Sequence, residues 1–206
     1  MKHCCENKAP EIQAMRAKHS RVLWSVLVIN AAMFFIEGGA GILAHSTSLL
    51  ADALDMLGDA LVYGFSLFVL SRSRQWQAAA AISKGVFMMV FGIGVLAEAI
   101  YKMVVPVMPN THVMGGIGLL ALIANLACFW LLYQHRDNNI NMRSTWLCSR
   151  NDLLANLGVL LAAGLGYIWL SRWPDIIVGL AIVALFLRSS WSVLQEAIKA
   201  WHSSGH

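Results

Sequence analysis

The sequence predicts an all-α, polytopic membrane protein with six transmembrane helices. Of its 206 residues, 58% are hydrophobic and 13% are charged, whereas a soluble domain carries about 25% charged residues. The apolar residues gather in six runs, each long enough to cross a hydrocarbon core about 30 Å thick. The length suits one compact domain. The polar first twenty residues lack the apolar core and cleavage site of a signal peptide.

The first two apolar runs form a hairpin. The first covers roughly residues 22–44, after a basic polar tail at residues 1–21, and it carries Glu37 near its end. The second run, residues 48–70, follows after a very short turn, so the two helices are antiparallel neighbours. Glu37 is therefore expected either to face acidic side chains of the second helix or to make a hydrogen bond that packs two helices together.

Polar or proline-containing loops separate the other four runs. Lys84 and Glu98 lie near the ends of the third run, where both are expected to extend their charged groups toward the membrane surface. Cys128 in the fourth run is expected to behave as a small hydrophobic residue. The four runs cover about residues 78–103, 113–133, 146–170 and 176–197, so a six-helix domain occupies residues 22–198 and a short cytosolic tail residues 199–206.

The distribution of basic residues predicts the topology. Six spans place both termini on one side of the membrane, and eleven of the 15 Lys and Arg residues lie on that side, against two on the other. Because cytoplasmic loops are enriched in basic residues, both termini are expected in the cytoplasm. The net charge of +4 does not indicate nucleic-acid binding, since the basic residues lie between apolar runs. The four cysteines do not resemble a disulfide framework.

Three aspartates interrupt the second run. Asp52, Asp55 and Asp59 fall on one face of a helix. Each costs roughly 2.5–3.5 kcal/mol near the centre of a bilayer, and the apolar residues of the run only just offset the total. These carboxylates must therefore face protein, water or a cation, and an ionisable group in a membrane is by default a functional hypothesis. Asp52 lies one turn closer to the outer end, so we expect it to cap or pack.

A second polar pair lies in the fifth run. Cys148 and Asp152 are four residues apart, as are Asp55 and Asp59, so each pair points along one face of its helix. Two such pairs on facing helices supply four ligands, which suits tetrahedral coordination of a divalent cation. In the alternative interpretation, Cys148 only packs against a neighbour near the cytosolic interface.

The chemistry of these four side chains limits the choice of metal. Three carboxylates and one thiolate favour Zn²⁺, Cd²⁺, Co²⁺ or Fe²⁺ over Mg²⁺ or Ca²⁺, which prefer ligand shells made of oxygen alone. Asn151 and Asn156 flank the same face of the fifth helix and are candidates to orient the ligands through hydrogen bonds.

Three stretches of the chain resemble the cation diffusion facilitator family. They are HSTSLLADALDMLGD at 45–59, NINMRSTWLCSRNDLLANLGVLLAA at 139–163 and PDIIVGLAIVALFLRSS at 174–190. The resemblance extends over residues 22–200 and implies a six-helix domain that exchanges Zn²⁺ or related ions for protons, usually as a dimer. It also implies a metal site with two ligands on the second helix and two on the fifth. By position these ligands are Asp55, Asp59, Cys148 and Asp152.

The chain departs from the family pattern at three places. The position of Cys148 is more usually His or Asp in the family. The His-rich loop between the fourth and fifth helices is reduced to His135, and the chain is expected to lack the cytosolic metal-binding domain that follows the sixth helix in relatives. Dimer contacts are therefore expected either to come from the membrane helices, where small residues such as Gly92 and Gly94 allow close packing, or to be absent.

Together these features predict a carrier that exports a divalent transition metal, of the Zn²⁺ or Cd²⁺ kind, in exchange for protons by alternating access. It is expected in a bacterial inner membrane, with metal, protons and lipid as partners, a possible homodimer, and no nucleic acid. It is not expected to be an enzyme, and it needs no catalytic residue and no cofactor. Two rivals remain: a membrane-embedded hydrolase that uses paired aspartates, and a structural or signalling membrane protein with inert carboxyls.

Overall fold

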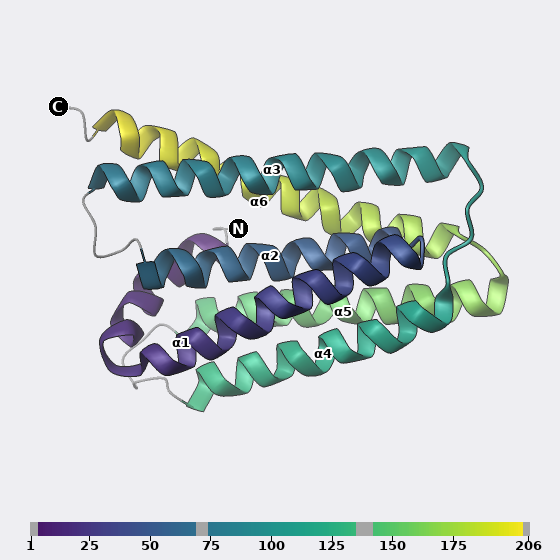
Figure 1. Ribbon diagram of the computed structural model, residues 1–206, viewed down its shortest axis with the longest axis horizontal. Coiled ribbons are helices and arrows are strands. Elements are labelled where there is room, and N and C mark those ends of the chain that lie inside the picture. Colours follow the sequence, from purple (N-terminus) through teal and green to yellow (C-terminus); the bar gives the residue numbers. More distant parts are fainter. Residues whose placement is uncertain (1–3, 69–73, 135–141, 204–206) are drawn as a thin grey trace.

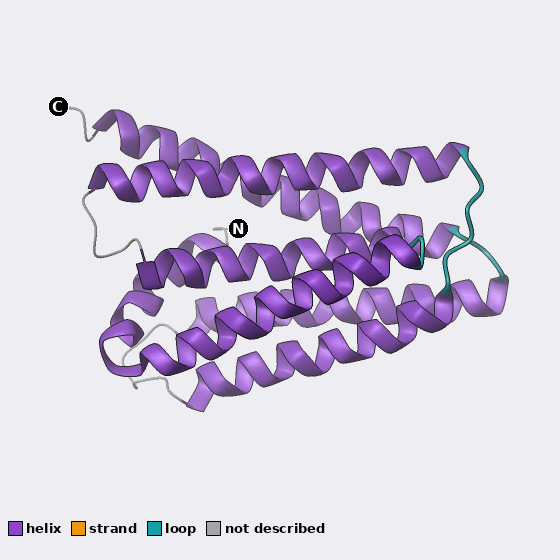
Figure 2. Ribbon diagram, in the orientation of Figure 1, coloured by secondary structure: helices purple, strands orange, loops and turns teal. Residues whose placement is uncertain are grey.

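The computed structural model describes residues 4–68, 74–134 and 142–203, and within these ranges the chain forms helices and short connections without strands (Figures 1 and 2). The predicted all-α class with six helices is confirmed. The helices are α1 Cys4–Leu43, α2 Thr47–Phe68, α3 Arg74–Val104, α4 Thr111–Gln134, α5 Met142–Trp169 and α6 Trp173–Ser203.

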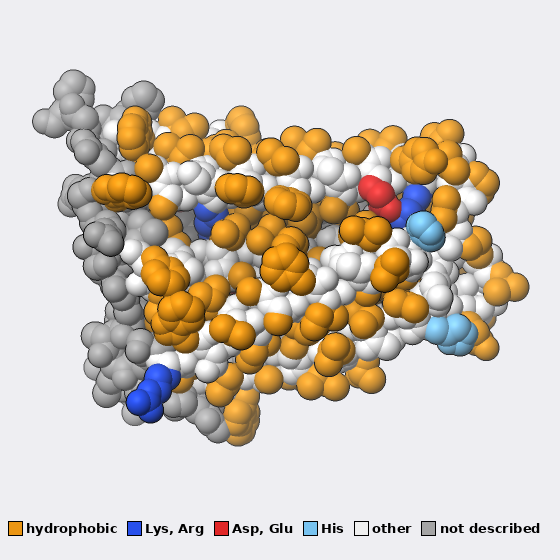
Figure 3. Space-filling model, in the orientation of Figure 1, with side chains coloured by type: hydrophobic (Ala, Val, Ile, Leu, Met, Phe, Trp, Pro, Cys, Tyr) orange, Lys and Arg blue, Asp and Glu red, His pale blue; other side chains and the backbone are white. Residues whose placement is uncertain are grey.

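The helices have the length and surface of membrane spans. Five segments are long and apolar enough to cross a bilayer: Arg21–Leu43, Ala78–Val104, Thr111–Leu132, Asp152–Trp169 and Trp173–Trp201. Hydrophobic side chains are spread along the described face in Figure 3, with few charged side chains among them, and large apolar residues such as Phe35, Leu161 and Leu185 are exposed. A soluble protein does not leave such extensive apolar surface in water. The chain is therefore an integral, polytopic membrane protein.

The second helix is the polar exception, and the other helices surround it. α2 carries three aspartates in its 22 residues and packs against α1, α3, α5 and α6. Figure 1 shows α3 and α6 along one side of α2, and α1, α4 and α5 along the other. The location of α2 between these helices explains how a helix with so many acidic residues can lie in a membrane, since its polar face meets protein.

Several helices begin earlier than hydropathy predicts. α1 begins at Cys4, so most of the basic segment before residue 22 is helical. α3 begins at Arg74 and α5 at Met142, each four residues before the predicted start of its run. Asp152 therefore lies farther from the end of its helix than a helix starting at Trp146 would place it.

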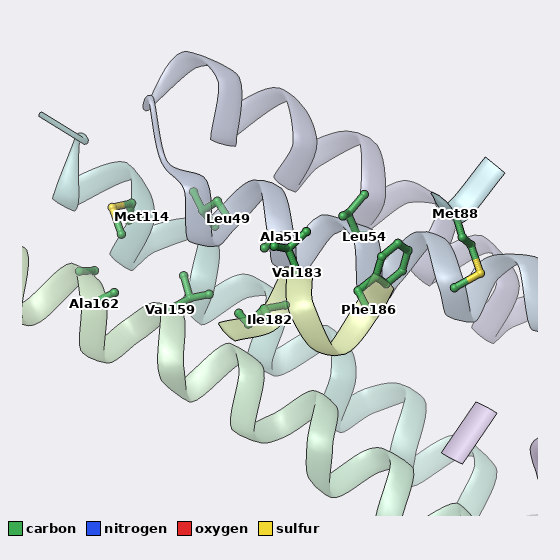
Figure 4. Close-up of a cluster of buried hydrophobic side chains, with 11 residues drawn as sticks. Leu49, Ala51, Leu54, Met88, Met114, Val159, Ala162, Ile182, Val183 and Phe186 are labelled. Carbon is green, nitrogen blue, oxygen red and sulfur yellow. The ribbon is translucent and has the colours of Figure 1, made fainter. Parts of the chain in front are cut away.

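An apolar core joins α2 to the helices around it. Figure 4 shows Leu49 and Leu54 of α2 near Val159 of α5 and Val183 and Phe186 of α6. These side chains are almost completely buried. The cluster also contains Met88 from α3 and Met114 from α4, so the core ties five helices together and fixes the rotation of α2 about its axis.

At the end of the bundle that holds the α1–α2 turn, one carboxylate of α6 caps α2. Asp175 is 2% exposed, and it accepts hydrogen bonds from the Thr47 and Ser48 backbone N–H groups at 2.8 and 2.9 Å. The Ser46 and Ser48 hydroxyls donate to it at 2.7 and 2.6 Å. The first N–H groups of a helix have no partner within the helix. Here a residue from a different helix satisfies two of them, so α6 holds the start of α2.

An ion pair lies beside this cap. Glu98 of α3 pairs with Lys102, and it accepts a hydrogen bond from the Thr47 hydroxyl at 2.9 Å. Lys102 is 4% exposed, whereas the side chain of Glu98 is 28% exposed. The extension of Glu98 toward the membrane surface stays a prediction, and the structure adds a partner for its charge one turn away.

Gly179 makes the contact between α6 and α2 possible. A Cβ atom at this position would lie 2.6 Å from Thr47 Cγ2 and 2.8 Å from the Thr47 carbonyl carbon. Since backbone atoms cannot yield without moving the capped start of α2, we expect Gly179→Ala to lower the free energy of unfolding by about 2 kcal/mol. Thermal unfolding in detergent measures this difference.

Gly164→Ala is the matched control for that substitution. Gly164 also lies inside a helix, α5, but a Cβ atom there would meet nothing within 4 Å. Because alanine is favoured over glycine in helices by about 1 kcal/mol, Gly164→Ala should leave the unfolding temperature unchanged or raise it. Equal unfolding temperatures for the two variants would contradict the tight α2–α6 contact.

Candidate metal centre

Three of the four predicted ligands have described side chains, and they lie on two helices that contact each other. Asp55 and Asp59 are one turn apart on α2, and Asp152 is on α5. All three are half-buried. Cys148 belongs to α5, but its side chain lies outside the described part of the chain, as does that of Asn151. The proposed four-ligand set therefore stays a prediction.

The described aspartates alone do not form a complete metal site. Among the side chains that the structure describes, no three His, Cys, Asp or Glu residues are gathered closely enough to hold a metal ion. A site at this place thus needs the Cys148 thiolate, a movement of α5 against α2, or both. Rocking of one helix group against another is how transporters of this architecture open and close a site.

Carboxylates from three helices nevertheless lie within electrostatic range of one another. The charge of Asp52 interacts with those of Glu37 on α1 and Asp152 on α5. Glu37 also interacts with Asp55. The acidic side chains of α1, α2 and α5 therefore converge on one region inside the membrane. Like charges repel one another strongly in a low dielectric, so the region is suited to a cation.

Two of these carboxylates are buried completely. Glu37 is 0% exposed and Asp52 is 1% exposed. Neither carboxylate oxygen of Glu37 has a hydrogen-bond partner among the described residues, and neither does Oδ2 of Asp52. Two roles were predicted for Glu37. Its interactions with Asp52 and Asp55 support the first, in which it faces the acidic side chains of α2. The second, a hydrogen bond that packs two helices together, is not found among the described residues. Asp52 is not the cap of α2, which Asp175 supplies.

Reasoning from the sequence did not place Glu37 and Asp52 together, although the hairpin contains the signal. α1 ends at Leu43 and α2 begins at Thr47. Glu37 lies six residues before the end of α1, and Asp52 lies five residues after the start of α2. In an antiparallel pair of helices these positions are at a similar depth. Counting residues in both directions from the α1–α2 turn would therefore have predicted that Glu37 and Asp52 are neighbours.

Two asparagines are buried on α1 and α5, the helices that carry Glu37 and Asp152. Asn156 is buried one turn after Asp152, and its Nδ2 donates to the Asp152 carbonyl oxygen at 2.8 Å. Its Oδ1 has no partner among the described residues. Asn30 of α1 donates to the Val26 carbonyl oxygen at 2.8 Å and to Cys128 Sγ at 3.6 Å. Cys128 is buried in an apolar cluster, which agrees with the prediction that it behaves as a small hydrophobic residue.

A helical membrane bundle that buries acidic side chains of several helices has the architecture of an ion-transport domain. Residues 23–200 match the model of the cation efflux transmembrane domain family, and the chain belongs to this family. The family is one of cation transporters. The predicted resemblance to cation diffusion facilitators is thereby confirmed.

The similar proteins are bacterial metal transporters. The chain is 30% identical over 194 residues to the zinc transporter ZitB of Escherichia coli, an alignment that covers 87% of this chain and 62% of the relative. It is 27% identical, with the same coverage, to the cadmium, cobalt and zinc/H⁺-K⁺ antiporter of Bacillus subtilis. A third relative is the metal cation efflux system protein CzcD of Cupriavidus metallidurans, at 23% identity. The chain spans less than two thirds of the length of each of these relatives.

Proposed function

We propose that this protein exports a divalent transition-metal cation of the Zn²⁺ or Cd²⁺ class in exchange for protons. The observation that carries the proposal is the convergence of carboxylates from α1, α2 and α5 inside the membrane. The names of the relatives, a zinc transporter and a cadmium, cobalt and zinc antiporter, support the same class of substrate. An inert structural protein has no reason to bury groups such as Glu37, whose carboxylate oxygens have no hydrogen-bond donor among the described residues.

The proposed metal site consists of Asp55 and Asp59 from α2 and Cys148 and Asp152 from α5. α2 and α5 are in contact, and Asp152 lies far enough along α5 for its charge to reach Asp52. The mixed oxygen and sulfur set favours borderline ions over Mg²⁺ and Ca²⁺. A relative movement of α2 and α5 would complete the site on one side of the membrane and open it on the other.

The proposed orientation has both termini in the cytoplasm of a bacterial inner membrane, as the distribution of basic residues favours. The working unit is proposed to be a homodimer held by the membrane helices. Gly92 is not available for such a contact, because a Cβ there would lie 2.6 Å from Leu187 Cδ2 of α6 in the same chain. Gly94 has open space around it and remains a candidate.

Metal flux into proteoliposomes under an imposed pH gradient tests the proposed exchange. A metal ligand must lose its proton to bind, so metal binding releases protons and acid weakens affinity. We expect Zn²⁺ or Cd²⁺ to accumulate in vesicles with an acidic interior, and the flux to fall when the gradient is removed at fixed membrane potential. Flux that ignores the gradient would indicate a uniporter, and no flux of any transition metal would overturn the proposal.

Changing Cys148 to Ser tests the sulfur ligand. Loss of the thiolate should weaken Cd²⁺ binding more than Zn²⁺ binding, because sulfur contributes most to the softer ion. We expect a loss of at least about tenfold for Cd²⁺, measured by titration calorimetry in detergent, and recovery of Zn²⁺ transport in Cys148→His. Cys128→Ser is the matched control, since Cys128 packs in an apolar cluster. Unchanged Cd²⁺ affinity in Cys148→Ser would remove this residue from the site.

A further inference from the structure

The carboxylate of Glu37 is the most unusual buried group among the described residues. It is 0% exposed, and both of its oxygens lack a hydrogen-bond donor in the described part of the chain. An isolated buried carboxylate costs many kcal/mol unless it is paired or neutralised. The residue lies on α1, outside the α2–α5 ligand set, so the proposed metal site does not account for it.

Two other buried oxygen atoms also lack a donor among the described residues. One is Oδ2 of Asp52, which interacts with Glu37 electrostatically. The other is Oδ1 of Asn156, which is 0% exposed and lies on the Asp152 face of α5. A packing network would contain donors that match these acceptors. Buried carboxylate oxygens that interact with one another and have no donor in the described part of the chain instead resemble the shell of a cation.

We propose that Glu37 and Asp52 form a second cation subsite, made of oxygen ligands alone, on the α1–α2 turn side of the proposed metal site. Their two carboxylates balance the charge of one divalent cation, and Asn156 Oδ1 lies on the neighbouring helix as a further neutral ligand. An oxygen-only shell prefers harder ions and holds Zn²⁺ or Cd²⁺ more weakly than a shell that includes sulfur.

The location suits a step in the passage of the cation. Glu37 interacts with Asp55 as well as with Asp52, so an ion that leaves Asp55 toward the turn end stays beside a carboxylate. A weaker second subsite would let the ion leave a tight site without crossing an uncompensated region of the membrane. This role in passage rests on the proposed function, whereas binding at the subsite does not.

Binding of Mn²⁺ tests the subsite, because Mn²⁺ prefers oxygen ligands and its binding is measured directly by electron paramagnetic resonance. The full chain is placed in lipid nanodiscs in an Asp59→Asn/Asp152→Asn background, which removes two proposed ligands of the main site. We expect bound Mn²⁺ to remain in this background. Adding Glu37→Gln or Asp52→Asn should weaken it by about 100-fold, whereas Glu37→Asp should retain most of the binding.

Glu196→Gln is the matched control, since it removes an exposed carboxylate from α6 and should leave Mn²⁺ binding unchanged. A folded background protein that binds no Mn²⁺, or binding that neither Glu37→Gln nor Asp52→Asn weakens, would overturn the subsite. Zn²⁺ flux through wild-type protein in vesicles separates the two proposals. Flux without a Glu37-dependent Mn²⁺ signal rejects only the subsite, and the signal without flux rejects only the transport function.

Discussion

Asp59→Asn is expected to reduce metal transport to background while the protein remains folded. Asparagine has the shape of aspartate but supplies no charge, so the proposed site would lose a ligand that balances the divalent cation. Loss of a ligand should weaken binding by at least about 100-fold. Zn²⁺ entry into proteoliposomes, followed with an indicator dye inside the vesicles, measures the effect. Asp55→Asn and Asp152→Asn are expected to behave in the same way.

The same substitution should not destabilise the protein. An aspartate near the bilayer centre costs roughly 2.5–3.5 kcal/mol, so its removal should leave the unfolding temperature unchanged or raise it. Loss of transport together with equal or higher stability is the expected signature of a ligand, because a packing residue would lower both. The exposed Glu196 provides a control in Glu196→Gln, which should alter neither. Wild-type flux in any of the three aspartate variants would exclude that residue from the site.

The helices could be predicted from hydropathy, but their ends could not. Six apolar runs determine six helices because a span must satisfy its backbone hydrogen bonds internally. Hydropathy marks the part of a helix that meets lipid and says little about where the hydrogen bonds stop. α1 therefore begins at Cys4 and α5 at Met142, both in polar sequence. The earlier start of α5 matters for the site, since it places Asp152 farther from the end of its helix.

The polar contacts depend on packing that one-dimensional patterns do not contain. Glu98 pairs with Lys102 on its own helix, which the spacing allowed, but its bond to Thr47 joins α3 to α2. Gly92 was predicted as a dimer contact because it is small, and it packs instead on Leu187 of the same chain. The bond from Thr47 to Glu98 and the contact between Gly92 and Leu187 were both decided by which helices are neighbours.

The acidic region was partly predictable for a similar reason. The hairpin places Glu37 opposite α2, so one of its two predicted roles is supported. That Asp52 reaches Asp152 depends on how α5 packs against α2, which no spacing within one helix can indicate. Asp55, Asp59, Asp152 and Cys148 remain a predicted ligand set, because the side chain of Cys148 lies outside the described residues.

Asp175→Ala is expected to be the most destabilising substitution at the turn end of the bundle. It removes the acceptor of four hydrogen bonds, two from backbone N–H groups of Thr47 and Ser48 and two from the hydroxyls of Ser46 and Ser48. Each buried donor left without an acceptor costs about 1–3 kcal/mol. We expect the free energy of unfolding to fall by at least about 3 kcal/mol, and thermal unfolding in detergent should show a clear decrease in midpoint.

Two further substitutions separate the cap from general damage at helix ends. Asp175→Asn keeps one acceptor oxygen in place, so it should destabilise less than Asp175→Ala. Asn110→Ala removes the cap of α4, where Asn110 Oδ1 accepts a single exposed hydrogen bond from the Val113 N–H at 3.3 Å, and such a cap contributes about 1 kcal/mol. The expected order of destabilisation is Asp175→Ala, Asp175→Asn and then Asn110→Ala. If Asp175→Ala proved no worse than Asn110→Ala, α6 would not hold the start of α2, and the acidic face of α2 would depend on the apolar core alone for its orientation.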